Sequence, residues 1–92
     1  MRQIEPIQYT TDGNEATQLE VNIVQDNLID SCYLEWKLYD INNQLVNNGM
    51  IFCGNYTYNI DNSTSTDYTD VKNDPYNFAA NNLSKPLTFV NL

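Results

Sequence analysis

The sequence contains no histidine, which is the commonest general base near neutral pH and the commonest zinc ligand in proteins. A Ser-His-Asp or Cys-His catalytic group therefore cannot form within this chain. The three glycines stand apart from one another, at Gly13, Gly49 and Gly54, so the chain has no glycine-rich loop that could hold a phosphate. We expect a protein that is not an enzyme and that uses no cofactor.

Positive charge is also scarce: the chain has four Lys and Arg residues and twelve Asp and Glu residues, which gives a net charge of −8. An acidic surface repels the phosphates of nucleic acids and of anionic membranes, so we expect neither as a partner. The simplest role of this acidity is solubility, and a match to a basic partner is the alternative.

Long apolar runs are missing as well. No segment approaches the length of a membrane span, and the opening MRQIEPIQYTTDG has no signal-peptide core. We therefore expect synthesis in a cytoplasm, with both cysteines reduced there.

The most regular pattern in the chain lies in residues 31–53. Cys32, Leu34, Trp36 and Leu38 alternate with more polar residues, as in a strand with one buried face. A two-residue turn at Asn42-Asn43 would make this segment a β-hairpin. That turn pairs Tyr39 with Val46, Trp36 with Gly49, Leu34 with Ile51, and Cys32 with Cys53. It also makes the cysteines a non-hydrogen-bonded pair, whereas a longer loop over 41–44 keeps the pairs and exchanges the hydrogen-bonding classes.

Further strands are predicted on either side of this hairpin. Residues 3–9 form an edge strand or arm, since Pro6 removes a ladder donor, and residues 17–25 alternate as a strand. Leu28 and Ile29 are expected to close the end of the core. Residues 56–60 form a fourth strand or an extended approach to the next segment.

The C-terminal third is predicted to be a loop, a helix and an extended end. Residues 61–70 are small and polar and form the longest loop. Asp74-Pro75 begins a helix that ends near Ser84, and residues 87–92 form a short strand or arm.

The predicted fold class is therefore α+β, a small and mainly antiparallel β-sheet or sandwich with one short C-terminal helix. An all-β sandwich is the alternative. Residues 1–92 form a single domain, with an N-terminal arm or edge strand over 1–10 and a C-terminal arm over 86–92.

Cys32 and Cys53 form no C-x-x-C motif, so neither zinc nor a redox motif is indicated. We interpret them as two small buried residues, and a cross-strand disulfide formed after release into an oxidising environment is the alternative. The acidic segment 61–74 could hold calcium through its carboxylates, but it lacks the spacing of an EF-hand. We expect a solvated loop there and no metal.

Tyrosine is abundant, with seven residues beside a single tryptophan. One explanation is a sheet whose two faces both pack against other elements, which would bury these aromatic side chains. The alternative is a binding role, because Tyr and Trp are also favoured at protein interfaces and in sugar-binding platforms. The candidate interface residues are Tyr33, Tyr39, Tyr56, Tyr58 and Tyr68.

Several short segments together carry a resemblance to a protein family. They are the opening IEPIQY, the strand QLEVNIVQDNL, WKLYD before a polar turn, NGM followed by an aliphatic residue, Gly54-x-Tyr56, and a terminal LTF after an acidic stretch and a short helix. In this layout the chain resembles small virion proteins of tailed bacteriophages that infect gut Bacteroidetes.

This resemblance implies a non-enzymatic structural or accessory component of the head, neck or tail, located in the virion. Its expected partners are other virion proteins or further copies of itself, bound through sheet edges, arms and aromatic faces. The family implies no site residues. A carbohydrate- or surface-binding β-module that uses Tyr and Trp side chains is the alternative function.

Overall fold

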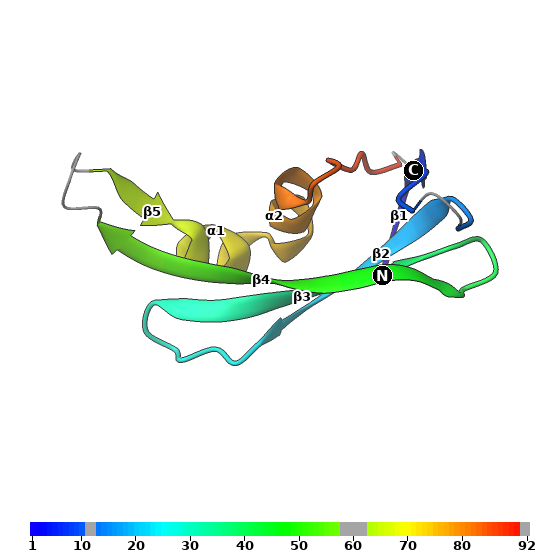
Figure 1. Cartoon of the computed structure of the whole chain (residues 1–92). Coiled ribbons are helices and arrows are strands. Elements are labelled where there is room, and N and C mark those ends of the chain that lie inside the picture. Colours follow the sequence, from blue (N-terminus) through cyan, green and yellow to red (C-terminus); the bar gives the residue numbers. More distant parts are fainter. Residues whose placement is uncertain (11–12, 58–62, 91–92) are drawn as a thin grey trace.

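The computed structural model describes residues 1–10, 13–57 and 63–90. Within them the strands form one antiparallel sheet in the order β1-β2-β3-β4-β5, as Figure 1 shows. The prediction of a small, mainly antiparallel α+β fold is confirmed, with two short helices in place of one. The elements are β1 Arg2–Ile7, β2 Ala16–Val24, β3 Ser31–Tyr39, β4 Leu45–Thr57, β5 Thr64–Thr66, α1 Asp67–Asn73 and α2 Pro75–Asn82.

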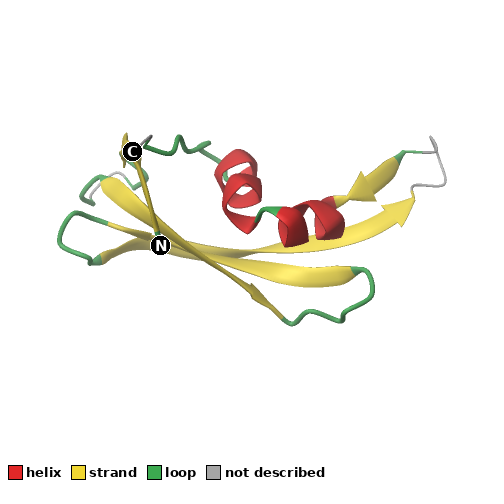
Figure 2. Ribbon diagram, turned by 180° about the vertical axis from the view of Figure 1, so that it is seen from behind, coloured by secondary structure: helices red, strands yellow, loops and turns green. Residues whose placement is uncertain are grey.

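Both helices lie on the same face of the sheet, which we call the helix face (Figures 1 and 2). The alternating residues of β2, β3 and β4 that point to this face form the core with the helices and the C-terminal segment. Its buried members include Leu19, Leu34, Leu38, Cys32, Cys53, Val71, Phe78 and Leu87. No described element covers the opposite side, which we call the open face.

The predicted register of the central hairpin is confirmed over most of its length, since Cys32 pairs with Cys53, Leu34 with Ile51 and Trp36 with Gly49. The indole explains the glycine opposite it. A Cβ atom on Gly49 would lie 2.7 Å from Trp36 Cζ2, so only a residue without a side chain fits under the ring.

The turn of this hairpin differs from the prediction. Asn43 N donates to Asp40 O, Asp40 N donates to Gln44 O, and Asn43 has φ of 60°. This is a type I turn followed by a left-handed residue, which makes a three-residue loop with a bulge in place of the two-residue turn. Because of the bulge, Tyr39 lies opposite Leu45 and not opposite Val46.

The longer loop also reverses the expected hydrogen-bonding class of the cysteines. Asn55 N donates to Asp30 O, which makes these two residues a hydrogen-bonded pair. Hydrogen-bonded and non-hydrogen-bonded pairs alternate along an antiparallel ladder. Cys32 and Cys53, two steps along, are therefore a hydrogen-bonded pair, as in the longer-loop alternative.

The C-terminal segment lies along the outer edge of β1. Glu5 N donates to Thr88 O, Val90 N donates to Gln3 O, and Ile4 and Phe89 form an isolated bridge. The expected extended end is thus present as one bridge and not as a full strand. It covers the edge at which β1 would otherwise be open.

The predicted loop over 61–70 is wrong where the structure describes it, because β5 and α1 occupy 64–73. The segment has no apolar stripe by which a helix could be recognised, since Val71 is the buried residue of α1. The helix that begins at Asp74-Pro75 is confirmed: Asp74 accepts a bond from Asn77 N, and α2 ends at Asn82. The strand expected over 56–60 continues β4 to Thr57, and residues 58–60 lie outside the described residues.

Candidate functional site

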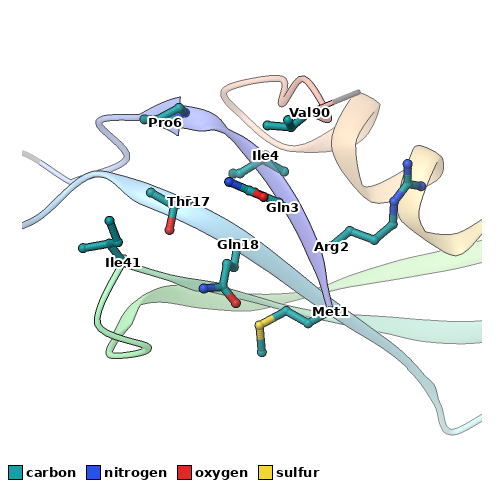
Figure 3. A pocket seen from close by; sticks show the side chains of 9 residues that line it. All are labelled: Met1, Arg2, Gln3, Ile4, Pro6, Thr17, Gln18, Ile41 and Val90. Carbon is teal, nitrogen blue, oxygen red and sulfur yellow. The ribbon is translucent and has the colours of Figure 1, made fainter. Parts of the chain in front are cut away.

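A hollow of about 590 Å³ lies beside β1, near the N-terminus of the chain (Figure 3). It lies among Met1, Arg2, Gln3, Ile4, Pro6, Thr17, Gln18, Ile41 and Val90. The guanidinium of Arg2 turns away from it and lies 3.8 Å from the centre of the Phe89 ring. The hollow is therefore mainly apolar and presents no acid-base pair for catalysis.

The buried charged side chain of the described residues is Asp40, which is 2% exposed. Asn14 Nδ2 donates to its Oδ2 atom, and the amides of Asn42 and Gln44 donate to its Oδ1 atom. These bonds, the one from Asn14 foremost, lower the pKa of the Asp40 carboxyl. The carboxylate is thus fully used in forming the hairpin turn and is not available to a substrate.

The open face carries an aromatic and apolar strip beside β4. Tyr33 and Phe52 face each other across β3 and β4, with ring centres 5.4 Å apart and ring planes at 67°. Phe52 is 53% exposed and Met50, one pair further along the same face, is 50% exposed. Tyr56, which is 46% exposed, follows on the same strand. Exposed apolar side chains gathered in this way make this strip a candidate interaction surface.

A second group of exposed apolar side chains lies in the loop between β2 and β3. Leu28 and Ile29 are each 79% exposed, so the prediction that they close the core is wrong. The Asn27 side chain explains why, because its oxygen accepts bonds from the amides of Ile29, Asp30 and Ser31. These bonds build a compact turn in which Leu28 takes a left-handed φ of 62° and points outward.

This loop is fixed to α1 through one carboxylate. Asp26 accepts bonds from the Tyr68 hydroxyl, the Lys72 ammonium and the Leu28 amide. The bond from Lys72 is the main reason that the pKa of Asp26 is lowered, and the same bond raises the pKa of Lys72. The bond to Asp26 raises the pKa of Tyr68. Leu28 and Ile29 are thus held outward on a well-connected loop.

The outer edge of β4 is the main open edge of the sheet. β5 pairs only with residues 55–57, so residues 45–54 have no neighbouring strand on that side among the described residues. Because Asn55 is bonded to Asp30, the alternation directs the N–H and C=O groups of Met50 and Phe52 outward. Asn47 Oδ1 accepts the bond of the Asn48 amide, and Gly54 O accepts one from Ser65.

The devices that normally protect such an edge are missing from β4. Protected edge strands are short or carry Lys, Pro or inward-pointing charges. β4 is the longest strand of the described chain, with 13 residues, and its sequence LVNNGMIFCGNYT contains neither Pro nor a charged residue. A bulge is present, but it lies at the start of the strand, between Leu38 and Tyr39 of the partner strand β3.

The candidate interface tyrosines occupy three different settings. Tyr33 and Tyr39 lie half-buried on β3 with their side chains on the open face, and Tyr56 is exposed. Tyr68 packs against the core and bonds Asp26, so its side chain connects α1 to the loop. Tyr58 lies outside the described residues.

The exposed residues that sequence reasoning missed are Met50, Phe52, Leu28 and Ile29. Met50 and Phe52 alternate with Ile51 and Cys53, so the period of two in β4 carried a signal for them. Leu28 and Ile29 gave no such signal, since their direction depends on the bonds of Asn27.

The two cysteines are free thiols, both buried in the core. Burial raises the pKa of Cys53 to about 12, and burial also raises the pKa of Cys32. A thiol is nucleophilic as its thiolate, so neither cysteine is suited to catalysis in this state.

Metal-binding clusters and helices that could span a membrane are both absent from the described part of the chain. Residues 1–10, 13–57 and 63–90 contain no group of three or more His, Cys, Asp or Glu side chains that could hold a metal ion. Asp61, in the acidic segment 61–74, lies outside these ranges. No helix in the same ranges is long and apolar enough to cross a membrane.

No protein-family model, curated protein or solved structure matches this chain. The open face, the loop with Leu28 and Ile29, and the β4 edge are therefore the basis for a functional proposal.

Proposed function

We propose that this chain is a non-enzymatic structural or accessory subunit of a tailed-bacteriophage virion. It binds neighbouring subunits through its sheet edge, its terminal segments and its open aromatic face. The observation that carries the proposal is the unpaired β4 edge beside the exposed side chains of Met50 and Phe52. Strand addition uses such an edge for affinity and the adjacent side chains for specificity.

The distribution of exposed apolar side chains supports a role in assembly. Three of them, Met50, Phe52 and Tyr56, lie in this order along β4. Two others, Leu28 and Ile29, lie on the loop that leads into β3. Covering these side chains removes apolar surface from water, which stabilises a complex. A small domain of this kind also gains folded-state stability from association.

The alternative, a carbohydrate-binding module, has less support. Sugar rings stack on aromatic rings that present a flat face, and the Tyr33 and Phe52 planes stand at 67° to each other. Their edge-to-face packing uses the two rings against each other and leaves no shared flat platform.

The test is mass spectrometry of purified particles from a phage that encodes the chain. The expected result is a fixed copy number relative to the major capsid protein, retained through gradient purification. Presence in the infected-cell lysate together with absence from the particles would contradict the proposal. Retardation of the purified protein on a polysaccharide matrix would favour the carbohydrate-binding alternative.

A further inference from the structure

We infer that the β4 edge binds the β4 edge of a second copy of this chain, in antiparallel register about a twofold axis at Ile51. This inference rests on the proposed function, because it names the partner of the same edge. Three observations carry it: the free backbone groups on β4, the place where β5 begins, and the absence of charge along the strand.

The free backbone groups determine the register. Within residues 45–54, the N–H and C=O groups of Met50 and Phe52 point outward and have no partner in the described chain. Two neighbouring groups are already bonded: Asn48 N donates to Asn47 Oδ1, and Gly54 O accepts a bond from Ser65 Oγ. A twofold axis at Ile51 places Met50 opposite Phe52 of the second copy. Each such pair exchanges two bonds in an antiparallel ladder, so every free group finds a partner.

The position of β5 limits the extent of this register. β5 occupies the outer edge of β4 at residues 55–57. With the axis at Ile51, residues 48–54 of one copy lie along residues 54–48 of the other. Residues 45–47 would then meet the edge that β5 of the other copy occupies, so the start of β4 has to bend away there, and the bulge between Asn47 and Leu45 lies at this point. A register shifted further toward the C-terminus would compete with β5 for Asn55.

The charge pattern favours a second copy at this edge. Two molecules that each carry a net charge of −8 repel each other over most of their surfaces. The 13 residues of β4 carry no charge, so two copies can meet along this strand without opposing carboxylates.

The side chains at the contact are also complementary. In the proposed register the thioether of Met50 lies beside the ring of Phe52 from the second copy, on the open face. Sulfur–aromatic contacts of this kind are favourable. Tyr33 already packs on Phe52 within one chain, so the contact extends an existing apolar strip across the joined sheet.

Sedimentation velocity over a range of concentrations tests the inference. We expect reversible dimers for the wild type, and a dissociation constant raised at least about tenfold in M50K/F52K, because like charges then face each other across the axis. M50E/F52E should raise the dissociation constant in the same way. An equimolar mixture of the two variants should dimerise again, since opposite charges then meet.

The matched control is L28K/I29K, which adds the same charges on exposed apolar residues away from the edge. It should dimerise like the wild type, and circular dichroism melting should show that every variant is folded. M50P tests the backbone bond separately, since it removes an N–H group that the internal ladder does not use. Hydrogen exchange should show the Met50 and Phe52 amides slowing as the concentration rises.

A wild type that stays monomeric up to the highest soluble concentration would overturn the inference. Dimers that survive M50K/F52K and M50P but not L28K/I29K would overturn it as well. These results are separable from failure of the proposed function. Monomeric protein found in particles refutes self-pairing alone, and dimeric protein absent from particles refutes the virion role alone.

Discussion

The contact between Trp36 and Gly49 gives the sharpest prediction about the fold. A Cβ atom added at Gly49 would lie 2.7 Å from Trp36 Cζ2 and 2.9 Å from Cε2. Carbon atoms in good contact lie about 3.5–4.0 Å apart, so the indole would have to move by about 0.8 Å or more. The ring also packs on Tyr9, whose ring centre lies 5.8 Å away, so the movement would disturb a second contact.

The expected cost of G49A follows from two opposing effects. Overpacking of a well-packed site costs about 1–3 kcal/mol. Replacing glycine by alanine also lowers the conformational entropy of the unfolded chain, which stabilises the folded state by about 0.4–1 kcal/mol. We expect net destabilisation of about 1–2 kcal/mol, which lowers the melting temperature by roughly 4–8 °C per kcal/mol in a domain of this size.

Thermal or urea unfolding followed by the fluorescence of Trp36, the only tryptophan, measures this change. The matched control is G54A, because the new Cβ would meet the exposed ring of Phe52 at 3.0 Å and that ring can rotate away. In a W36F background the penalty of G49A should shrink, since the smaller ring lacks the atoms that clash. A G49A protein as stable as the wild type would refute the reasoning.

Three other substitutions or conditions have defined outcomes. L34A should cost about 2–5 kcal/mol in urea unfolding, because Leu34 is fully buried; a cost below about 1 kcal/mol would place it outside the core. Cys32 and Cys53 should resist iodoacetamide at pH 8 in the folded protein, because burial raises both thiol pKa values, and both should react once the protein is denatured without reductant. Failure to label the denatured protein would indicate the disulfide. The pKa of Asp26 is lowered in the folded state by Lys72, so its stabilising effect is present above its unfolded pKa of about 3.9 and is lost as pH falls through the lower folded value. The difference in melting temperature between wild type and D26N should therefore be large at pH 6 and shrink at pH 2.5; a difference independent of pH would contradict this role.

The strands were predictable because each carries its own pattern. Alternation located the two strands of the central hairpin, and the pairing of Trp36 with Gly49 followed from a single turn position. The end of the hairpin was not predictable in the same way. Asp40 bonds two amides within the turn and selects a three-residue loop, and this choice depends on a carboxylate that the pattern does not register.

The positions of the candidate interface residues were only partly predictable, and their role stays a prediction. Alternation placed Tyr33 and Tyr39 on the face of β3 opposite Trp36, and the structure has them there, half-buried, while Tyr56 is exposed on β4. The free backbone of Met50 and Phe52 could not be predicted, since it depends on where β5 stops. A short helix such as α1, held by Tyr68 and Lys72 bonding to Asp26, likewise depends on contacts between distant segments.

The contact between β1 and the C-terminal segment has a consequence for the order of folding. Strands β1 to β4 pair only with their neighbours in sequence, so each hairpin can form as soon as its own residues are free to meet. The bridge between Ile4 and Phe89 instead joins opposite ends of the described chain. Its formation costs the conformational entropy that is lost when such a long loop closes. This contact should therefore be the last to form and the first to open. Until it forms, the outward backbone groups of Gln3 and Glu5 are open to pairing with another strand.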